Sequence, residues 1–155
     1  MARCPTIAVA VDDRQSLLRV SERWVRSIVR GTLEAQRIVV AEIGVLLLED
    51  RAMARLNTRW LAHAGPTDVI TFPIGSPEEP GCDRLRGDLA VSVETAAREA
   101  VRLGWHPRRE LAYYLVHGLL HLTGHDDTTA AARRRMRRRE REVMGLLGLP
   151  APPRQ

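Results

Sequence analysis

The segment from His117 to Asp127, HGLLHLTGHDD, constrains the fold of this chain more than any other feature. It holds three of the five histidines and two carboxylates within eleven residues. Residues four apart on an α-helix share one face, with Cβ atoms about 6 Å apart, so His117 and His121 can direct imidazole nitrogens at one ion. His125 cannot join them on the same helix, because it lies about 12 Å further along the axis than His117 and ligands lie about 2 Å from zinc. The helix must therefore end, and the chain must turn back.

Gly124 occupies the position where this helix has to end, because glycine readily adopts the left-handed conformation that terminates helices. After the turn, Asp127 follows His121 by six residues. This is the offset of the third ligand in the H-x-x-x-H-x-x-G-x-x-H pattern of metzincins. We therefore expect a metzincin-like ligand helix and three metal ligands: His117, His121 and Asp127.

Two further residues of the segment are expected to lie beside the ligands. His125 is interpreted as a loop residue next to the metal, and Asp126 as a hydrogen-bond acceptor that orients a ligand imidazole. The alternative is an amphipathic helix that carries two histidines and ends in a polar cap. The metal site is favoured by Gly124, by the carboxylate of Asp127 at the matching offset and by the apolar residues of the preceding helix.

The residue directly after the first histidine is Gly118, where zinc peptidases of this pattern place a glutamate as general base. Any hydrolysis must then rely on water activated by the metal, or on a base from elsewhere in the fold. Peptidase activity is disfavoured. A two-histidine, one-carboxylate oxygenase is also disfavoured, because both histidines come from one helix.

Hydrophobic periodicity predicts an α+β fold, in which one mixed sheet of about four strands packs against helices. Asp50 is expected to cap the second helix, and His106 and Pro107 to begin the ligand helix. We expect one domain over residues 1–149 and a flexible tail over 150–155. The predicted strands are 6–11, 38–48, 69–74 and 89–93, and the predicted helices are 17–33, 51–60, 95–103, 107–123 and a basic helix around 133–142.

Composition narrows the possible compartments. The chain has 155 residues, of which 45% are hydrophobic, with no apolar run long enough for a signal peptide or a membrane span. Its two cysteines, Cys4 and Cys82, form no CxxC pair and are interpreted as free thiols. We therefore expect a cytoplasmic protein.

Positive charge is concentrated in the last helix. All 24 basic residues are arginine, and between Arg133 and Glu142 seven arginines and two glutamates give a local net charge of +5, equal to that of the whole chain. Apolar residues at helical spacing indicate that only one face is basic. The simpler interpretation is that this basic face is only solvated. However, the helix follows closely after the predicted metal site, and this favours contact of its arginines with RNA phosphates. The arginines expected to bind RNA are Arg133, Arg134, Arg137, Arg138 and Arg141.

These motifs together resemble the YbeY family, the bacterial rRNA maturation factors described as metal-dependent, single-strand-specific endoribonucleases. The family pattern H-G-x-L-H-L-x-G-[YH]-D-H matches from His117 to Asp126. Residues 56–63 and 67–73 are similar to its L-N-x-x-Y-R…T-D-V-L-S-F-P block, and residues 87–92 to its G-D-I-x-I-S strand. The resemblance implies a zinc-dependent endoribonuclease that acts on the 3′ end of 16S rRNA and in ribosome quality control, with rRNA and ribosomal proteins as partners.

Two positions depart from the family pattern. Asp127 replaces the usual third histidine, which makes the bound metal less electropositive and also suits Mn²⁺ or Fe²⁺. Leu61 stands where the family tends to have an arginine that is thought to serve RNA cleavage. This second departure keeps open an alternative function, a non-catalytic ribosome-assembly factor with a structural metal.

Three further polar residues are candidates for the surroundings of the metal or for a substrate cleft: Asn57, His63 and Asp88. The tryptophans are interpreted as core residues. Because the chain has only one Phe and two Tyr, it lacks the aromatic surface that stacks single-stranded bases, and RNA recognition is expected to be mainly electrostatic.

Overall fold

The structure, a computed structural model, describes residues 6–61, 68–75, 84–151 and 153. His63 and the two cysteines lie outside these ranges, as does part of the predicted tail. In chain order the elements are β1 (Thr6–Asp13), α1 (Glu22–Ala35), β2 (Val40–Leu48), α2 (Asp50–Leu61), β3 (Val69–Pro73), β4 (Leu85–Ser92), α3 (Val93–Leu103), α4 (Pro107–Leu122) and α5 (Ala130–Leu146). The predicted α+β class is confirmed.

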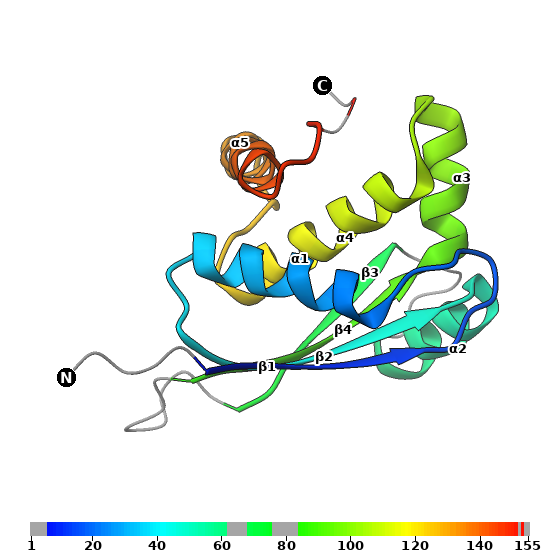
Figure 1. Cartoon of the computed structure of the whole chain (residues 1–155), viewed down its shortest axis with the longest axis horizontal. Helices are drawn as coiled ribbons and strands as arrows, with labels where there is room; N and C mark the ends of the chain where they lie inside the picture. Colours follow the sequence, from blue (N-terminus) through cyan, green and yellow to red (C-terminus); the bar gives the residue numbers. More distant parts are fainter. Residues whose placement is uncertain (1–5, 62–67, 76–83, 152, 154–155) are drawn as a thin grey trace.

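The four strands form one mixed sheet in the order β1-β2-β4-β3. β1, β2 and β4 run parallel, and β3 pairs antiparallel with β4 at one edge. Helices α1, α4 and α5 lie on one side of the sheet, whereas α2 lies on the other (Figure 1). The ligand helix α4 contacts both β3 and β4. It is therefore held against the antiparallel edge of the sheet.

The main core lies between the sheet and the helices α1, α4 and α5. Alternate residues of β2 point into it, each at most 2% exposed, as expected for a strand with one covered face: Ala41, Ile43, Val45 and Leu47. α4 contributes Leu111, Leu115, Leu119 and Leu120, all fully buried. Burial of one such leucine side chain contributes about 1.5–3 kcal/mol. The helix that carries the histidines is thus fixed by its apolar side.

Gly118 allows α4 to approach the sheet closely. A Cβ atom at this position would lie 2.9 Å from Leu89 Cδ2 and 3.0 Å from Val69 Cγ2, both of which belong to the sheet. Position 118 therefore faces β3 and β4. Any side chain on residue 118 would collide with the sheet. Close packing is therefore one reason why no glutamate stands here.

The first helix begins later than predicted. Periodicity placed its start at Leu17, but α1 starts at Glu22, where the side chain of Ser21 accepts a hydrogen bond from Trp24 N. The residues before it form a turn that the side chain of Gln15 holds through the backbone N–H and C=O groups of Leu18. Leu18 and Val20 pack on the core from this turn without helical geometry, whereas Leu17 is exposed, so Val20 imitated part of a helical pattern.

Two other predicted boundaries were wrong. β4 starts at Leu85 rather than at 89, because it pairs with β2 along its whole length and polar residues occupy the open face. α3 starts at Val93, with Ser92 as its N-cap. Asp50 does not cap α2 but forms its first residue, and its carboxylate accepts hydrogen bonds from the Ser92 and Thr95 hydroxyls. This carboxylate links α2 to the start of α3.

Candidate metal centre

Helix α4 presents two imidazoles on one face near its C-terminal end. The helix begins as predicted, with His106 as N-cap and Pro107 in the first turn. His117 and His121 are one turn apart, and their Nε2 atoms face each other at 3.1 Å. Two nitrogens bound to one tetrahedral zinc at 2.0–2.1 Å would lie roughly 3.3 Å apart. The separation therefore suits a shared cation.

Asp127 completes a group of three. Its Oδ2 atom lies 3.5 Å from His121 Nε2 and 3.9 Å from His117 Nε2. The three ligand atoms all lie within 4.8 Å of one another. The Asp127 side chain is 39% exposed, compared with 19% and 28% for the two histidines, so a ligand from solvent can reach the point where the three meet. Two imidazoles and a carboxylate form a donor set suited to zinc and to harder divalent metals.

The turn after α4 brings the carboxylate to the imidazoles. Gly124 adopts a φ of 101°, its N–H donates to His121 O, and His125 N–H donates to Leu120 O at 2.9 Å. This is the Schellman arrangement, which ends a helix at a left-handed residue. The predicted role of Gly124 as the end of the helix is confirmed.

Asp126 shapes the same turn. Its carboxylate accepts hydrogen bonds from the backbone N–H groups of Asp127 and Thr128, at 2.7 and 3.1 Å, and from the Thr128 hydroxyl. The bonds from Thr128 and Asp127 hold the pKa of Asp126 below its ordinary value. The carboxylate thus binds to the turn, whereas the sequence interpretation assigned it to an imidazole. The orientation of the imidazoles depends on other residues.

Glu140, a residue of α5 that the sequence analysis missed, binds the first imidazole. Its Oε1 atom lies 2.6 Å from His117 Nδ1, and its Oε2 atom accepts a hydrogen bond from the Tyr113 hydroxyl at 2.8 Å. Burial lowers the pKa of His117, but the hydrogen bond to Glu140 and the charges of Glu140, Asp68 and Asp127 raise it above its ordinary value. A sequence signal existed, since Glu140 follows Met136 by four residues on the apolar stripe of α5.

The second imidazole is oriented by the turn. His121 Nδ1–H donates to the backbone carbonyl of His125 at 3.1 Å. The His125 ring itself accepts a hydrogen bond from Gln36 Nε2 at 2.8 Å, and the carbonyl oxygen of the Gln36 side chain accepts one from Arg139 Nε at 2.7 Å. Burial, together with the charges of Arg139 and His121, lowers the pKa of His125 below its ordinary value. The end of α1, the turn and α5 are thereby joined behind the ligands.

Comparison with known proteins assigns the chain to a family. Residues 10–148 match the family described as Endoribonuclease YbeY. The chain belongs to this family. A relative of this name from Desulforamulus reducens is 34% identical over 92% of this chain and 99% of its own length. One from Moorella thermoacetica is 40% identical over 70% of this chain and 74% of its own length. One from Myxococcus xanthus is 35% identical over 94% of this chain, which spans about half (49%) of that relative's length.

A solved structure shares the fold. The solution structure of the Thermotoga maritima protein TM1509 superposes with a TM-score of 0.57, at 20% identity, over 90% of each chain. This likeness supports the α+β architecture. Among the described residues, no helix has both the length and the apolar character needed to cross a membrane.

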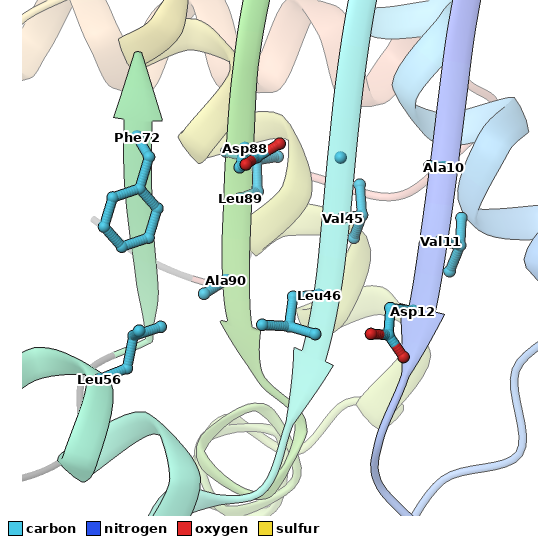
Figure 2. A pocket seen from close by; sticks show the side chains of 11 residues that line it. Ala10, Val11, Asp12, Val45, Leu46, Leu56, Phe72, Asp88, Leu89 and Ala90 are labelled. Carbon is cyan, nitrogen blue, oxygen red and sulfur yellow. The ribbon is translucent and has the colours of Figure 1, made fainter. Parts of the chain in front are cut away.

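Of the other candidate polar residues of this YbeY family member, the structure describes Asn57 and Asp88. Asn57 is buried on α2, and Asp88 projects from β4 on the sheet face opposite α4. Asp88 lines an open groove of about 470 Å³, into which Phe72 and Leu46 also project (Figure 2). The sheet separates this groove from the metal ligands. His63 lies outside the described residues.

The five arginines expected to bind RNA all lie exposed on α5: Arg133, Arg134, Arg137, Arg138 and Arg141. Arg133 lies nearest the ligand turn, where its Nη1 atom is 3.3 Å from Asp127 O and 3.4 Å from Thr128 O. Arg139, on the opposite face, is directed toward Gln36. Helix α5 therefore presents one basic face to solvent and another face to the metal ligands.

Proposed function

We propose that this protein is a metal-dependent, single-strand-specific endoribonuclease that acts in maturation of the 3′ end of 16S rRNA and in ribosome quality control. The observation that carries the proposal is the convergence of three ligand atoms, from α4 and the turn after it, in a chain of the Endoribonuclease YbeY family. The same geometry leaves the ligand group open to solvent, as hydrolytic metal sites require.

His117, His121 and Asp127 hold the ion, one per chain. Zinc suits this donor set best, and the carboxylate also admits Mn²⁺ or Fe²⁺. When bound, the metal supplies Lewis acidity, either to activate water or to stabilise charge on the phosphate. His125 O and Glu140 hold the imidazoles with their Nε2 atoms directed toward the ligand group. Gly118 has no side chain that could act as a general base, so no proton transfer is assigned to this position. The protein side chains near the site bind and orient the metal and the substrate.

The exposed arginines of α5 contact the RNA backbone. Guanidinium groups bind phosphates in a bidentate way and do so without regard to sequence. The helix begins three residues after Asp127, so a strand bound along it passes the metal. Ribosomal proteins and the ribosome are the partners that fit a role in rRNA processing, and the cytoplasm is the compartment that fits it.

Cleavage of end-labelled single-stranded RNA from the 3′ region of small-subunit rRNA tests this function. We expect the metal-reconstituted parent to cleave and a His121→Ala variant to lose both stoichiometric metal and cleavage. Stoichiometric metal retained by His121→Ala would overturn the ligand assignment. Equal cleavage by both proteins would identify a contaminating nuclease, and a repurified parent that then fails to cleave would contradict the proposal.

A non-catalytic assembly factor with a structural metal is the second candidate function. Leu61, in place of the family arginine, is the observation that favours it. A Leu61→Arg variant separates the two candidates. RNA cleavage by the parent supports the enzyme, whereas metal-loaded parent that fails to cleave, beside a Leu61→Arg variant that cleaves, supports the assembly factor.

A further inference from the structure

Glu140 is a buried carboxylate in the middle of the most basic helix of the molecule. It is 2% exposed, and arginines precede and follow it in the sequence. Burial of a charge is unfavourable unless the charge is paired and hydrogen-bonded. Both oxygens of Glu140 are satisfied inside the protein, one by His117 and one by Tyr113. These two partners lie inside the protein, and neither is one of the neighbouring arginines.

The contact with His117 fixes which ring nitrogen is available to a metal. Nδ1–H donates to Glu140, so the lone pair of the neutral ring lies on Nε2. That Nε2 atom is the one that faces His121 Nε2 at 3.1 Å and Asp127 Oδ2 at 3.9 Å. A hydrogen bond to Nδ1 with a purely structural purpose would not require two further potential ligand atoms to face Nε2. Here both nitrogens of the ring are committed, one to α5 and one to the ligand group.

The two ligand imidazoles are supported differently. A neutral backbone carbonyl accepts the Nδ1 proton of His121, whereas a charged carboxylate accepts that of His117. A carboxylate acceptor raises the basicity of the imidazole more than a carbonyl does, and it also adds negative charge behind the ligand. Asp127 and Glu140 together supply two negative charges, which match a divalent cation.

We propose that Glu140 is a positioning residue of the metal centre, which holds His117 with Nε2 toward the ion and strengthens metal binding. It acts through His117 and does not contact the metal or the RNA. Helix α5 then supports the metal from its buried face and binds phosphate from its exposed face. The inference rests on the proposed function only in so far as the three ligands bind a metal.

Metal affinity, measured without RNA, tests the role of Glu140. The full chain is stripped of metal and titrated with Co²⁺, followed by visible absorption, and with Zn²⁺ in competition with a chelator. We compare the parent with Glu140→Leu, which removes the hydrogen bond, and with Glu140→Gln, which keeps an acceptor for Nδ1–H but removes the charge. Glu142→Gln is the matched control, because Glu142 lies two residues further on α5 and is exposed.

Loss of such a supporting group typically lowers metal affinity about 10–100-fold. We expect a loss of this size in Glu140→Leu, with an altered Co²⁺ spectrum, partial recovery in Glu140→Gln and no change in Glu142→Gln. Parent affinity in both Glu140 variants would overturn the proposal. If Glu140→Leu does not fold, as judged by circular dichroism, the comparison of Glu140→Gln with Glu142→Gln decides. A parent that binds metal tightly but cleaves no RNA contradicts the proposed function and leaves the role of Glu140 intact.

Discussion

Asp127 is the residue at which this chain departs from the ligand pattern of its family, and the departure concerns charge rather than position. Its Oδ2 atom lies 3.5 and 3.9 Å from the two imidazoles, so the carboxylate stands where the proposed site needs its third ligand. A carboxylate donates a full negative charge to the ion, whereas an imidazole donates none. A metal held by the proposed ligands would then be a weaker Lewis acid, and water bound to it would be less acidic.

Replacement of Asp127 by histidine tests this consequence. We expect the pH at which RNA cleavage reaches half its maximum to be lower in Asp127→His than in the parent, and the preference for zinc over Mn²⁺ to increase. The measurement is a pH–rate profile for each protein with each metal. Coincident profiles would show that the charge of the third ligand does not control the reaction.

At the scale of single elements, Gly118 of α4 matters both for packing against the sheet and for the position of the candidate metal ligand beside it. Gly118 lets the helix approach β3 and β4, and this contact places the neighbouring His117 near the sheet edge. Helix α5 likewise has two roles, with an exposed basic face and a buried face that contacts His117 through Glu140. Arginine and glutamate alternate from Arg139 to Glu142, but the fold buries Glu140 and leaves Arg141 and Glu142 exposed.

A Gly118→Ala substitution measures the close approach of α4. Its Cβ atom would overlap Leu89 and Val69, and overpacking of a core typically costs about 1–3 kcal/mol. Alanine recovers about 1 kcal/mol of helix propensity over glycine. We therefore expect the free energy of unfolding to fall by up to about 2 kcal/mol in a denaturant titration.

Gly145→Ala is the control for this substitution. Gly145 lies in α5, and a Cβ atom there meets nothing within 4 Å. Only the propensity gain applies, so we expect unchanged or increased stability, by at most about 1 kcal/mol. Equal effects of the two substitutions would mean that the packing of Gly118 against the sheet contributes nothing.

On the scale of the whole molecule, the sheet divides two surfaces. The metal ligands and the arginines of α5 belong to one side, and α2 and the groove that contains Asp88 to the other (Figures 1 and 2). The first strand and the last helix contribute to one core cluster, which supports the proposal of a single domain over residues 1–149. Positive charge is spread over both sides, so total charge does not identify the RNA-binding side.

Two matched pairs of arginines distinguish the sides. Arg134 and Arg138 are exposed four residues apart on α5, and Arg51 and Arg55 are exposed four residues apart on α2. Each phosphate contact with single-stranded RNA contributes about 0.7 to the slope of log affinity against log salt. We expect replacement of Arg134 and Arg138 by glutamine to reduce that slope by about 1.4, and replacement of Arg51 and Arg55 to leave it unchanged.

The slope is measured from RNA-binding isotherms over a range of salt concentrations, with metal-loaded protein. Equal reductions for both pairs would indicate that binding follows net charge and not the α5 face. A larger reduction of the slope for the α2 pair would indicate that RNA binds on the other side of the sheet.

The sequence by itself determined the local features of this protein. The spacing of His117 and His121, the position of Gly124 and the N-cap at His106 depend on contacts within a few residues, so periodicity and turn chemistry were sufficient to predict them. The strand pattern likewise predicted an α+β sheet. The start of α1 was mispredicted, because tertiary burial of a turn can imitate the apolar spacing of a helix.

The tertiary structure decided which distant side chains support that local motif. Glu140, Gln36 and Arg139 are 18 to 85 residues from His121 in the chain, and their polar or charged side chains indicate a solvated surface when only the sequence is considered. Packing of α5 and of the end of α1 beside α4 brings them to the imidazoles. The alternation of side chains along β4 turns Gly87 and Leu89 toward α4 and leaves Asp88 on the far side of the sheet. Hydrogen bonds form where three-dimensional approach allows them, and a sequence pattern records only neighbours along the chain.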